Sequence, residues 1–169
     1  MSKVLSIDYD RCNGCEICAL HCSFAKTGTF NPRRSRVHIA HWEERGLFVP
    51  SMCLHCDEPP CTAACPEEAI SKDRKTGTVS IDYDKCMNHL TCIPACPYGA
   101  LTIDPIDGRV IECDLCGGDP ICAKVCPVGV IQFVEVNKSG LAKWRKDVKK
   151  LAEVLNSTPG RSSEKERTE

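Results

Sequence analysis

The chain has 169 residues, of which 42% are hydrophobic and 27% charged, and its formal net charge is −1. This balance argues against a nucleic-acid-binding protein, which usually presents a strongly basic face, and no apolar run approaches the roughly 18 residues that cross a bilayer. The first ten residues contain no apolar signal-peptide core, so we expect a cytoplasmic protein.

Fifteen cysteines dominate the composition. Such a density is typical of small secreted proteins held by disulfides, but the count is odd and the cytosol keeps thiols reduced. Aromatic residues make up only 5% of the chain, so a conventional hydrophobic core would be thin. Bound metal is therefore the expected source of cross-linking.

In chain order the cysteines form four runs. The runs are Cys12-x2-Cys15-x2-Cys18-x3-Cys22, Cys53-x2-Cys56-x4-Cys61-x3-Cys65-Pro66, Cys86-x5-Cys92-x3-Cys96-Pro97 and Cys113-x2-Cys116-x5-Cys122-x3-Cys126-Pro127. The spacing of run one is that of bacterial ferredoxins with [4Fe–4S] clusters. Structural zinc is the alternative for a single Cys-x2-Cys pair. All four runs end in Cys-x3-Cys, however, and this common ending favours iron–sulfur clusters over zinc.

An internal repeat identifies a candidate for one further ligand. Four [4Fe–4S] clusters need four ligands each, one more than the fifteen cysteines provide. Residues 7–15 read Ile-Asp-Tyr-Asp-Arg-Cys-Asn-Gly-Cys and residues 81–89 read Ile-Asp-Tyr-Asp-Lys-Cys-Met-Asn-His, so His89 stands where Cys15 stands. His89 either binds iron, as imidazole does in Rieske centres, or leaves a [3Fe–4S] cluster or an empty or water-capped position. We expect the other histidines to be surface or packing residues: His21, His38, His41 and His55.

Short apolar segments flank the runs. Segments 4–7, 79–81 and 110–111 precede runs, and segments 69–70, 100–103 and 130–134 follow them. We expect short strands here, paired in small antiparallel sheets, with hairpin turns at Gly77 and Gly108. One-turn helices are expected at 63–64 and 93–95.

The C-terminal segment differs from the rest of the chain. Residues 137–156 predict an amphipathic helix, which docks either on its own subunit or on a partner. Its apolar stripe consists of Leu141, Trp144, Val148, Leu151 and Leu155. Residues 157–169 contain no large apolar side chain, so we expect a disordered tail.

Together the four runs resemble the four-cluster iron–sulfur subunits of molybdenum and tungsten oxidoreductases. The resemblance covers about residues 3–136, and the stretch 22–39 looks most like subunits that accompany tungsten aldehyde oxidoreductases. It implies an α+β fold of two interleaved bacterial-ferredoxin-like units within residues 1–136, followed by the C-terminal helix. Runs one and four would form one unit, and runs two and three the other.

The resemblance also implies the ligand pairing, because in such proteins the last cysteine of a run binds the other cluster of its unit. The implied sets are Cys12, Cys15, Cys18 and Cys126 for cluster 1; Cys113, Cys116, Cys122 and Cys22 for cluster 2; Cys53, Cys56, Cys61 and Cys96 for cluster 3; and Cys86, His89, Cys92 and Cys65 for cluster 4.

The function implied is electron transfer rather than catalysis. The partner would be a larger catalytic subunit of the tungsten or molybdenum pterin type, with a further redox subunit or a ferredoxin at the other end. The sequence shows no phosphate-binding glycine loop and no nucleophile motif. The alternatives are a free polyferredoxin carrier, the equivalent subunit of a formate dehydrogenase, hydrogenase or dimethyl sulfoxide reductase-type enzyme, and a zinc-binding interaction module.

Overall fold

The computed structural model describes residues 3–136 and, beyond them, residues 142, 145–146, 148–150 and 153–154. Its helices are short and its strands span two to five residues. In chain order the elements are β1 (Lys3–Ile7), η1 (Tyr9–Arg11), α1 (Ile17–Thr27), η2 (Pro32–Arg34), β2 (His38–Trp42), η3 (Glu43–Arg45), β3 (Leu47–Ser51), α2 (Pro60–Ala63), β4 (Ile70–Lys72), β5 (Val79–Ile81), α3 (Cys92–Ala95), β6 (Thr102–Ile103), β7 (Val110–Ile111), η4 (Leu115–Gly118), α4 (Ile121–Val125) and β8 (Ile131–Glu135), where η marks a 3-10 helix.

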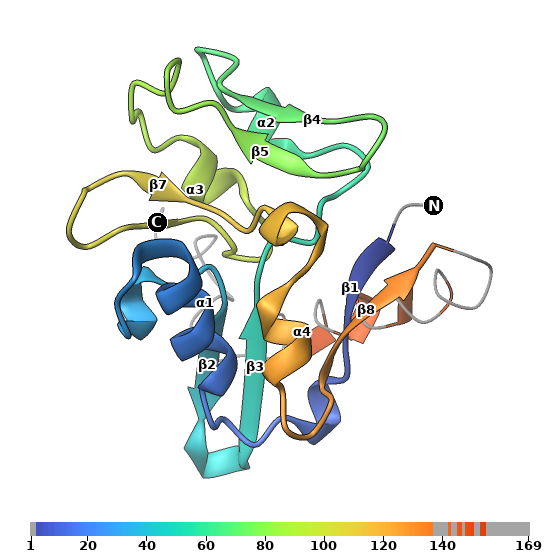
Figure 1. The fold of residues 1–169 in the computed structure, drawn as a ribbon. Coiled ribbons are helices and arrows are strands. Elements are labelled where there is room, and N and C mark those ends of the chain that lie inside the picture. Colours follow the sequence, from blue (N-terminus) through green and yellow to red (C-terminus); the bar gives the residue numbers. More distant parts are fainter. Residues whose placement is uncertain (1–2, 137–141, 143–144, 147, 151–152, 155–169) are drawn as a thin grey trace, which may run out of the picture.

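The strands pair into four antiparallel sheets of two strands each within the described residues: β1 with β8, β2 with β3, β4 with β5, and β6 with β7. The predicted mixture of short helices and small antiparallel sheets is confirmed, and the β4–β5 and β6–β7 hairpins enclose the expected turns at Gly77 and Gly108. The pairing of β1 with β8 joins Lys3 to Glu135 and Ile7 to Ile131, so the first and last strands lie side by side (Figure 1).

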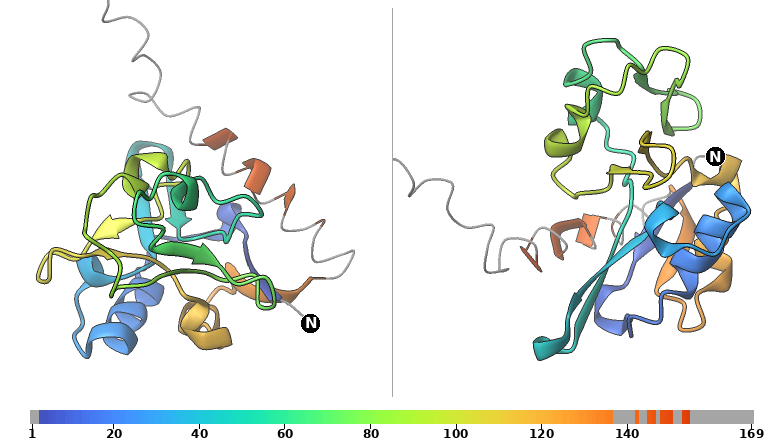
Figure 2. Two further views of the ribbon diagram at one scale, coloured as in Figure 1. Left: turned by 90° about the horizontal axis from the view of Figure 1, so that it is seen from above. Right: turned by 90° about the vertical axis from the view of Figure 1, so that its left-hand side faces the viewer.

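Two hydrophobic cores lie at opposite ends of the molecule. The larger core combines residues of runs one and four with β1, β3 and β8, and the smaller core combines residues of runs two and three with β4, β5 and β7. Helix α1 packs against α4 and α2 packs against α3. In Figures 1 and 2 the elements around α2, α3, β4 and β5 accordingly form one end, and α1, α4, β1 and β8 form the other.

Helix α1 is longer than the one-turn helices of runs two and three. In run one Ser23 follows the last cysteine, whereas proline follows it in the other three runs. Because no proline interrupts the hydrogen bonding, α1 continues through Cys22 to Thr27. The helix ends at Gly28, whose φ of 69° allows its N–H to reach the carbonyl of Phe24.

A buried ion pair connects the two ends of the fold. The Arg34 guanidinium, on η2, donates from Nε to both carboxylate oxygens of Asp104, at 3.0 and 2.8 Å, and from a terminal nitrogen to Asp107 at 3.1 Å. Asp104 follows β6 and is only 2% exposed. The pair therefore ties the segment after run one to the hairpin after run three.

The expected C-terminal helix falls largely outside the described residues, as do Leu141, Trp144, Leu151, Leu155 and the tail 157–169. The described residues between 142 and 154 are helical. Val148 and Val154 pack against the larger core, and Lys150 forms an ion pair with Asp10.

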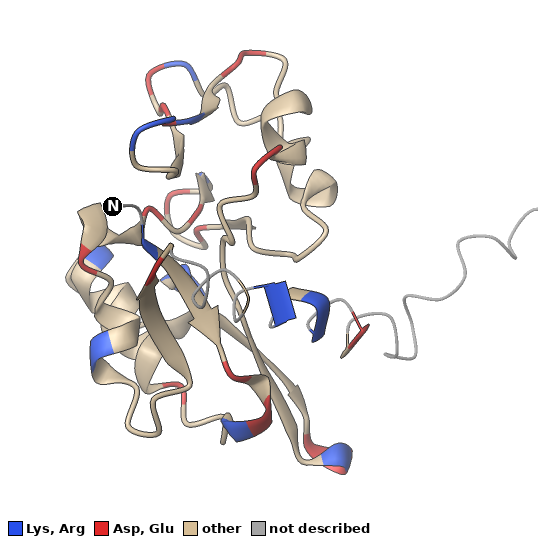
Figure 3. Ribbon diagram, turned by 90° about the vertical axis from the view of Figure 1, so that its right-hand side faces the viewer, with Lys and Arg blue, Asp and Glu red and all other residues tan. Residues whose placement is uncertain are grey.

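Within the described part of the chain, no helix is long and apolar enough to cross a membrane. Figure 3 shows basic and acidic residues interspersed over the elements and loops of the described chain.

Candidate iron–sulfur cluster sites

The four cysteine runs share one backbone conformation. Two residues after the first cysteine of each run, φ is positive: 70° at Gly14, 50° at His55, 59° at Asn88 and 56° at Leu115. For residues other than glycine this conformation costs roughly 1–2 kcal/mol, and such strain gathers at functional sites. In runs one, two and four, the backbone N–H of this residue hydrogen-bonds to the thiol of the first cysteine. The strained loop therefore directs a backbone donor at a sulfur.

The thiols form four groups of electrostatic neighbours, each drawn from two runs. The groups are Cys12, Cys15, Cys18 and Cys126; Cys113, Cys116, Cys122 and Cys22; Cys53, Cys56, Cys61 and Cys96; and Cys86, Cys92 and Cys65. The structure thus brings together the cysteines that the resemblance assigns to each cluster.

The four groups also follow one another in space. In addition to burial, Cys18 lies near enough to raise the pKa of Cys122, which makes the first group a neighbour of the second, and Cys113 raises the pKa of Cys53, which makes the second a neighbour of the third. Again in addition to burial, the carboxyl group of Glu112 raises the pKa of both Cys61 in the third group and Cys92 in the fourth, and the helices that carry these two cysteines, α2 and α3, pack against each other. The order first, second, third, fourth is therefore a chain of neighbours.

Burial suppresses ionisation of several of these thiols. It raises the pKa of Cys18 to about 12, of Cys61 to about 11 and of Cys113 to about 12. Iron binds the thiolate rather than the thiol, so iron must displace protons here, and its positive charge must offset the cost of burying the anions. The raised pKa values are thus a cost that cluster binding must overcome, and the fit to an iron–sulfur cluster rests on the sulfur donors gathered in each group.

The last cysteine of each run receives a backbone hydrogen bond at sulfur. The N–H four residues later donates to Cys65 and Cys96 at 3.4 Å and to Cys126 at 3.2 Å. Run one lacks the Cys–Pro turn, and Cys22 instead accepts from the N–H of Arg36 at 3.4 Å. Hydrogen bonds to ligand sulfurs stabilise negative charge and tune cluster potentials.

Two of the thiol groups surround cavities. Cys12, Cys15, Cys18 and Cys126 line one cavity, and Cys65, Cys86, Cys92 and His89 line the other; both cavities are small and partly open to solvent. His89 therefore faces the same space as the three thiols of the fourth group. A zinc site would need its ligands about 2.3 Å from one ion, and across the described residues no three His, Cys, Asp or Glu side chains are set to hold a single metal ion.

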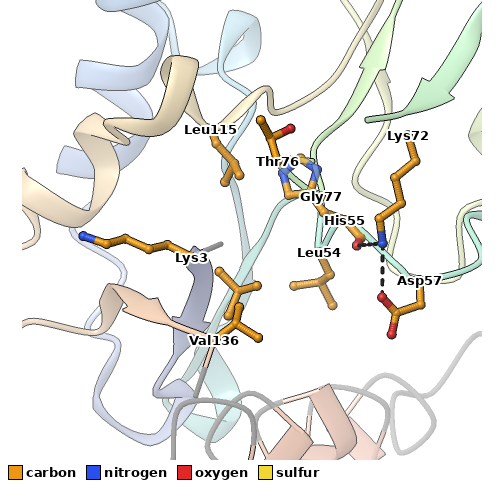
Figure 4. A pocket seen from close by; sticks show the side chains of 10 residues that line it. Lys3, Leu54, His55, Asp57, Lys72, Thr76, Gly77, Leu115 and Val136 are labelled. Carbon is orange, nitrogen blue, oxygen red and sulfur yellow. Dashed lines mark hydrogen bonds and ion pairs between the residues drawn. The ribbon is translucent and has the colours of Figure 1, made fainter. Parts of the chain in front are cut away.

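Lys72 anchors the loop of run two. Its ammonium donates to the carbonyls of His55 and Cys56, at 3.3 and 2.9 Å, and to the Asp57 carboxylate at 3.1 Å. Figure 4 shows Lys72 beside His55 and Asp57. His55 accepts the Val79 N–H at Nδ1, and burial together with the charge of Lys72 lowers its pKa to about 4. His55 is therefore a neutral packing residue, in line with the expectation for the histidines other than His89.

Two carboxyl groups near the thiols were not singled out from the sequence. Glu112 precedes Cys113, is only 6% exposed, and has its pKa raised to about 8 by burial and by Asp114. Glu67 hydrogen-bonds to His89. Glu112 could not have been recognised from its position beside a cysteine, because charged residues flank several of the candidate ligands. Glu67 could have been found by comparing the residue two positions after the last cysteine in all four runs.

Residues 44–136, which include runs two, three and four, match the family model described as "4Fe-4S dicluster domain". The chain belongs to the 4Fe-4S dicluster domain family. Run one precedes the matched region.

Several relatives of this dicluster-domain protein are subunits of oxidoreductases. The "aliphatic sulfonate oxidoreductase, polyferredoxin-like subunit" of Pyrococcus furiosus is 39% identical over 117 residues, which cover 69% of this chain and 67% of the relative. The B subunit of the anaerobic dimethyl sulfoxide reductase of Escherichia coli is 32% identical, over 78% of this chain and 73% of its own length. The "NADH-dependent phenylglyoxylate dehydrogenase subunit beta" of Aromatoleum evansii is 35% identical over 78% of this chain, which spans only 30% of that protein.

These findings confirm the predicted general class of the protein: it is an iron–sulfur electron-transfer subunit of oxidoreductases, with ferredoxin-like [4Fe–4S] domains. The named relatives belong to several different enzymes. The narrower likeness to partners of tungsten aldehyde oxidoreductases stays a prediction, as does the cytoplasmic location.

Proposed function

We propose that this chain binds four [4Fe–4S] clusters and conducts electrons between a catalytic subunit and a second redox partner. The observation that carries the proposal is the spatial order of the four thiol groups, in which each group neighbours the next. Such clusters accept and release one electron at a time. The residues of this chain hold the clusters in sequence and set their potentials through burial and N–H···S hydrogen bonds.

The ligands proposed are the four sets given above, with His89 completing the set of Cys65, Cys86 and Cys92. Two features support this assignment: the thiols of each set are electrostatic neighbours, and His89 lines a cavity with its three cysteines. The two hydrophobic cores support a division of residues 1–136 into two ferredoxin-like units, one from runs one and four and the other from runs two and three.

For the catalytic partner we propose a larger subunit of the tungsten or molybdenum pterin type, of the aldehyde oxidoreductase class. The likeness of residues 22–39 supports this choice, and so does the similarity to subunits of other multi-subunit oxidoreductases. A free polyferredoxin carrier would have the same clusters without a stable catalytic partner.

The test is anaerobic purification of the protein from its native cells, followed by analysis of iron, sulfide, tungsten and molybdenum and by native mass spectrometry. The proposal expects about 16 iron atoms per chain, four for each cluster, and a co-purifying subunit that contains tungsten or molybdenum. A full iron content in a protein that migrates alone would support the free carrier. Fewer than four clusters per chain would refute the proposed path for electrons through four clusters.

A further inference from the structure

Glu67 and His89 form a pair at the edge of the fourth candidate site. Nε2 of His89 lies 3.1 Å from a carboxylate oxygen of Glu67, and the two side chains are 47% and 44% exposed. Glu67 follows Cys65 by two residues, and both residues line the cavity shared with Cys86 and Cys92. The run that would supply the fourth cysteine of this site therefore also supplies the carboxylate.

The internal repeat provides a matched comparison. In the first cavity, Cys15 occupies the position of His89, and Val128, two residues after Cys126, occupies the position of Glu67. The other two runs have Phe24 and Tyr98 at this position. Among the four runs, a carboxylate thus follows the last cysteine only where the facing ligand position holds histidine.

Electrostatics explains why these two changes belong together. A carboxylate beside an anionic thiolate ligand would repel it, so an uncharged residue suits a Cys position. An ionised carboxylate can only accept hydrogen bonds, so the ring nitrogen that faces it must carry the proton. With the proton on Nε2, the lone pair of the neutral imidazole is on Nδ1, which is then free to act as a metal ligand. Carboxylates orient metal-binding histidines in this way in many proteins.

We propose that Glu67 is a positioning residue for His89: it holds the imidazole with Nε2 protonated, so that Nδ1 binds iron of the cluster at Cys65, Cys86 and Cys92. This inference rests on the proposed four-cluster function. One interaction thus explains why the two side chains lie together. It also explains why both positions differ from the other runs, with His89 in place of a cysteine and Glu67 in place of an uncharged residue.

The test uses the full-length protein with its clusters and compares Glu67→Val with Glu67→Gln. Valine is the residue that the repeat has at Val128, and glutamine keeps an acceptor oxygen while it removes the charge. The control is Glu68→Gln, which removes a charge at the neighbouring exposed residue. The readouts are the nitrogen hyperfine coupling of the reduced protein in pulsed electron paramagnetic resonance, and the rate at which oxidation and chelator convert one cluster to a [3Fe–4S] form.

We expect wild type and Glu68→Gln to show a coordinated nitrogen. Glu67→Val should weaken that signal and speed iron loss at one cluster by at least about tenfold, the usual effect of removing such a partner, with Glu67→Gln between them. The signals of the other three clusters verify that each variant is folded. The background His89→Cys supplies the decisive comparison, since Glu67→Val should slow iron loss or leave it unchanged there.

Equal iron loss in Glu67→Val and Glu68→Gln, or the same acceleration in the His89→Cys background, would overturn the role of Glu67. A wild-type protein with four clusters and no coordinated nitrogen would refute this inference and the assignment of His89 as a ligand, and it would leave the proposed electron transfer through four clusters intact. Fewer than four clusters in wild type would instead refute the proposed function.

Discussion

Replacing Arg34 with alanine should loosen the connection between the two ends of the fold. Asp104 is 2% exposed and receives both of its short side-chain hydrogen bonds from Arg34. Removing one partner of a buried ion pair costs about 3–5 kcal/mol, because the other charge stays buried. Asp104 keeps the N–H groups of Ile106 and Asp107, at 2.9 and 3.3 Å, so we expect the lower end, about 3 kcal/mol.

The assay follows the loss of visible cluster absorbance in guanidinium under argon. Because cluster loss is irreversible, a rate is the appropriate measure of stability. A loss of about 3 kcal/mol raises the rate by up to about 160-fold if the pair is broken in the transition state of unfolding. Arg33→Ala is the matched control, since Arg33 lies on the same turn and is exposed. The double variant Arg34→Ala with Asp104→Asn should recover part of the loss. Equal rates for Arg34→Ala and Arg33→Ala would refute this reasoning.

Three further predictions concern cluster dependence, backbone strain and pH. Removal of iron should abolish the cooperative thermal transition in circular dichroism, because metal ligation replaces much of the small apolar core; a cooperative melt of the iron-free protein would contradict this. Gly14→Ala should lower iron content more than Gly77→Ala, since both sites have positive φ but only at Gly14 would a Cβ meet another residue, 2.5 Å from the Phe48 ring; equal iron contents would count against the clash. Burial and the neighbouring Arg36 lower the pKa of His38. The folded state thus binds fewer protons at His38 than the unfolded state, and stability falls as pH drops below about 6.5. His38→Gln should flatten the pH dependence of cluster loss between about pH 7 and 5, and an unchanged slope would show that other groups dominate.

Local patterns in the sequence predict much of this fold. The repeat that identifies His89 extends to the backbone conformation. Gly14 and Asn88, at equivalent positions, have φ of 70° and 59°. Two residues later, Glu16 and Leu90 have φ of 56° and 64°. Short strands and hairpin turns follow from β-branched residues and glycines. The longer helix α1 could also be predicted, because no proline follows Cys22.

Partners far apart in the chain could not be predicted in this way. Arg34 and Asp104 are separated by 70 residues, and His89 and Glu67 by 22. The pairing of β1 with β8 joins the two ends of the described domain. Such contacts depend on how the runs cross in space. The pairing of the runs came from a family resemblance, because spacing alone does not determine it.

The Cys–Pro turns also bear on how the protein acquires its iron. In runs two, three and four, the fixed φ of proline and the N–H four residues later orient the last thiol through the local chain alone. A thiol that is oriented within a four-residue loop leaves less conformational entropy for cluster insertion to remove than a thiol oriented by a contact across a longer loop. Cys22 depends instead on Arg36, fourteen residues away, and therefore on the folding of a longer segment. During maturation, the site closed by Cys22 is expected to be filled last.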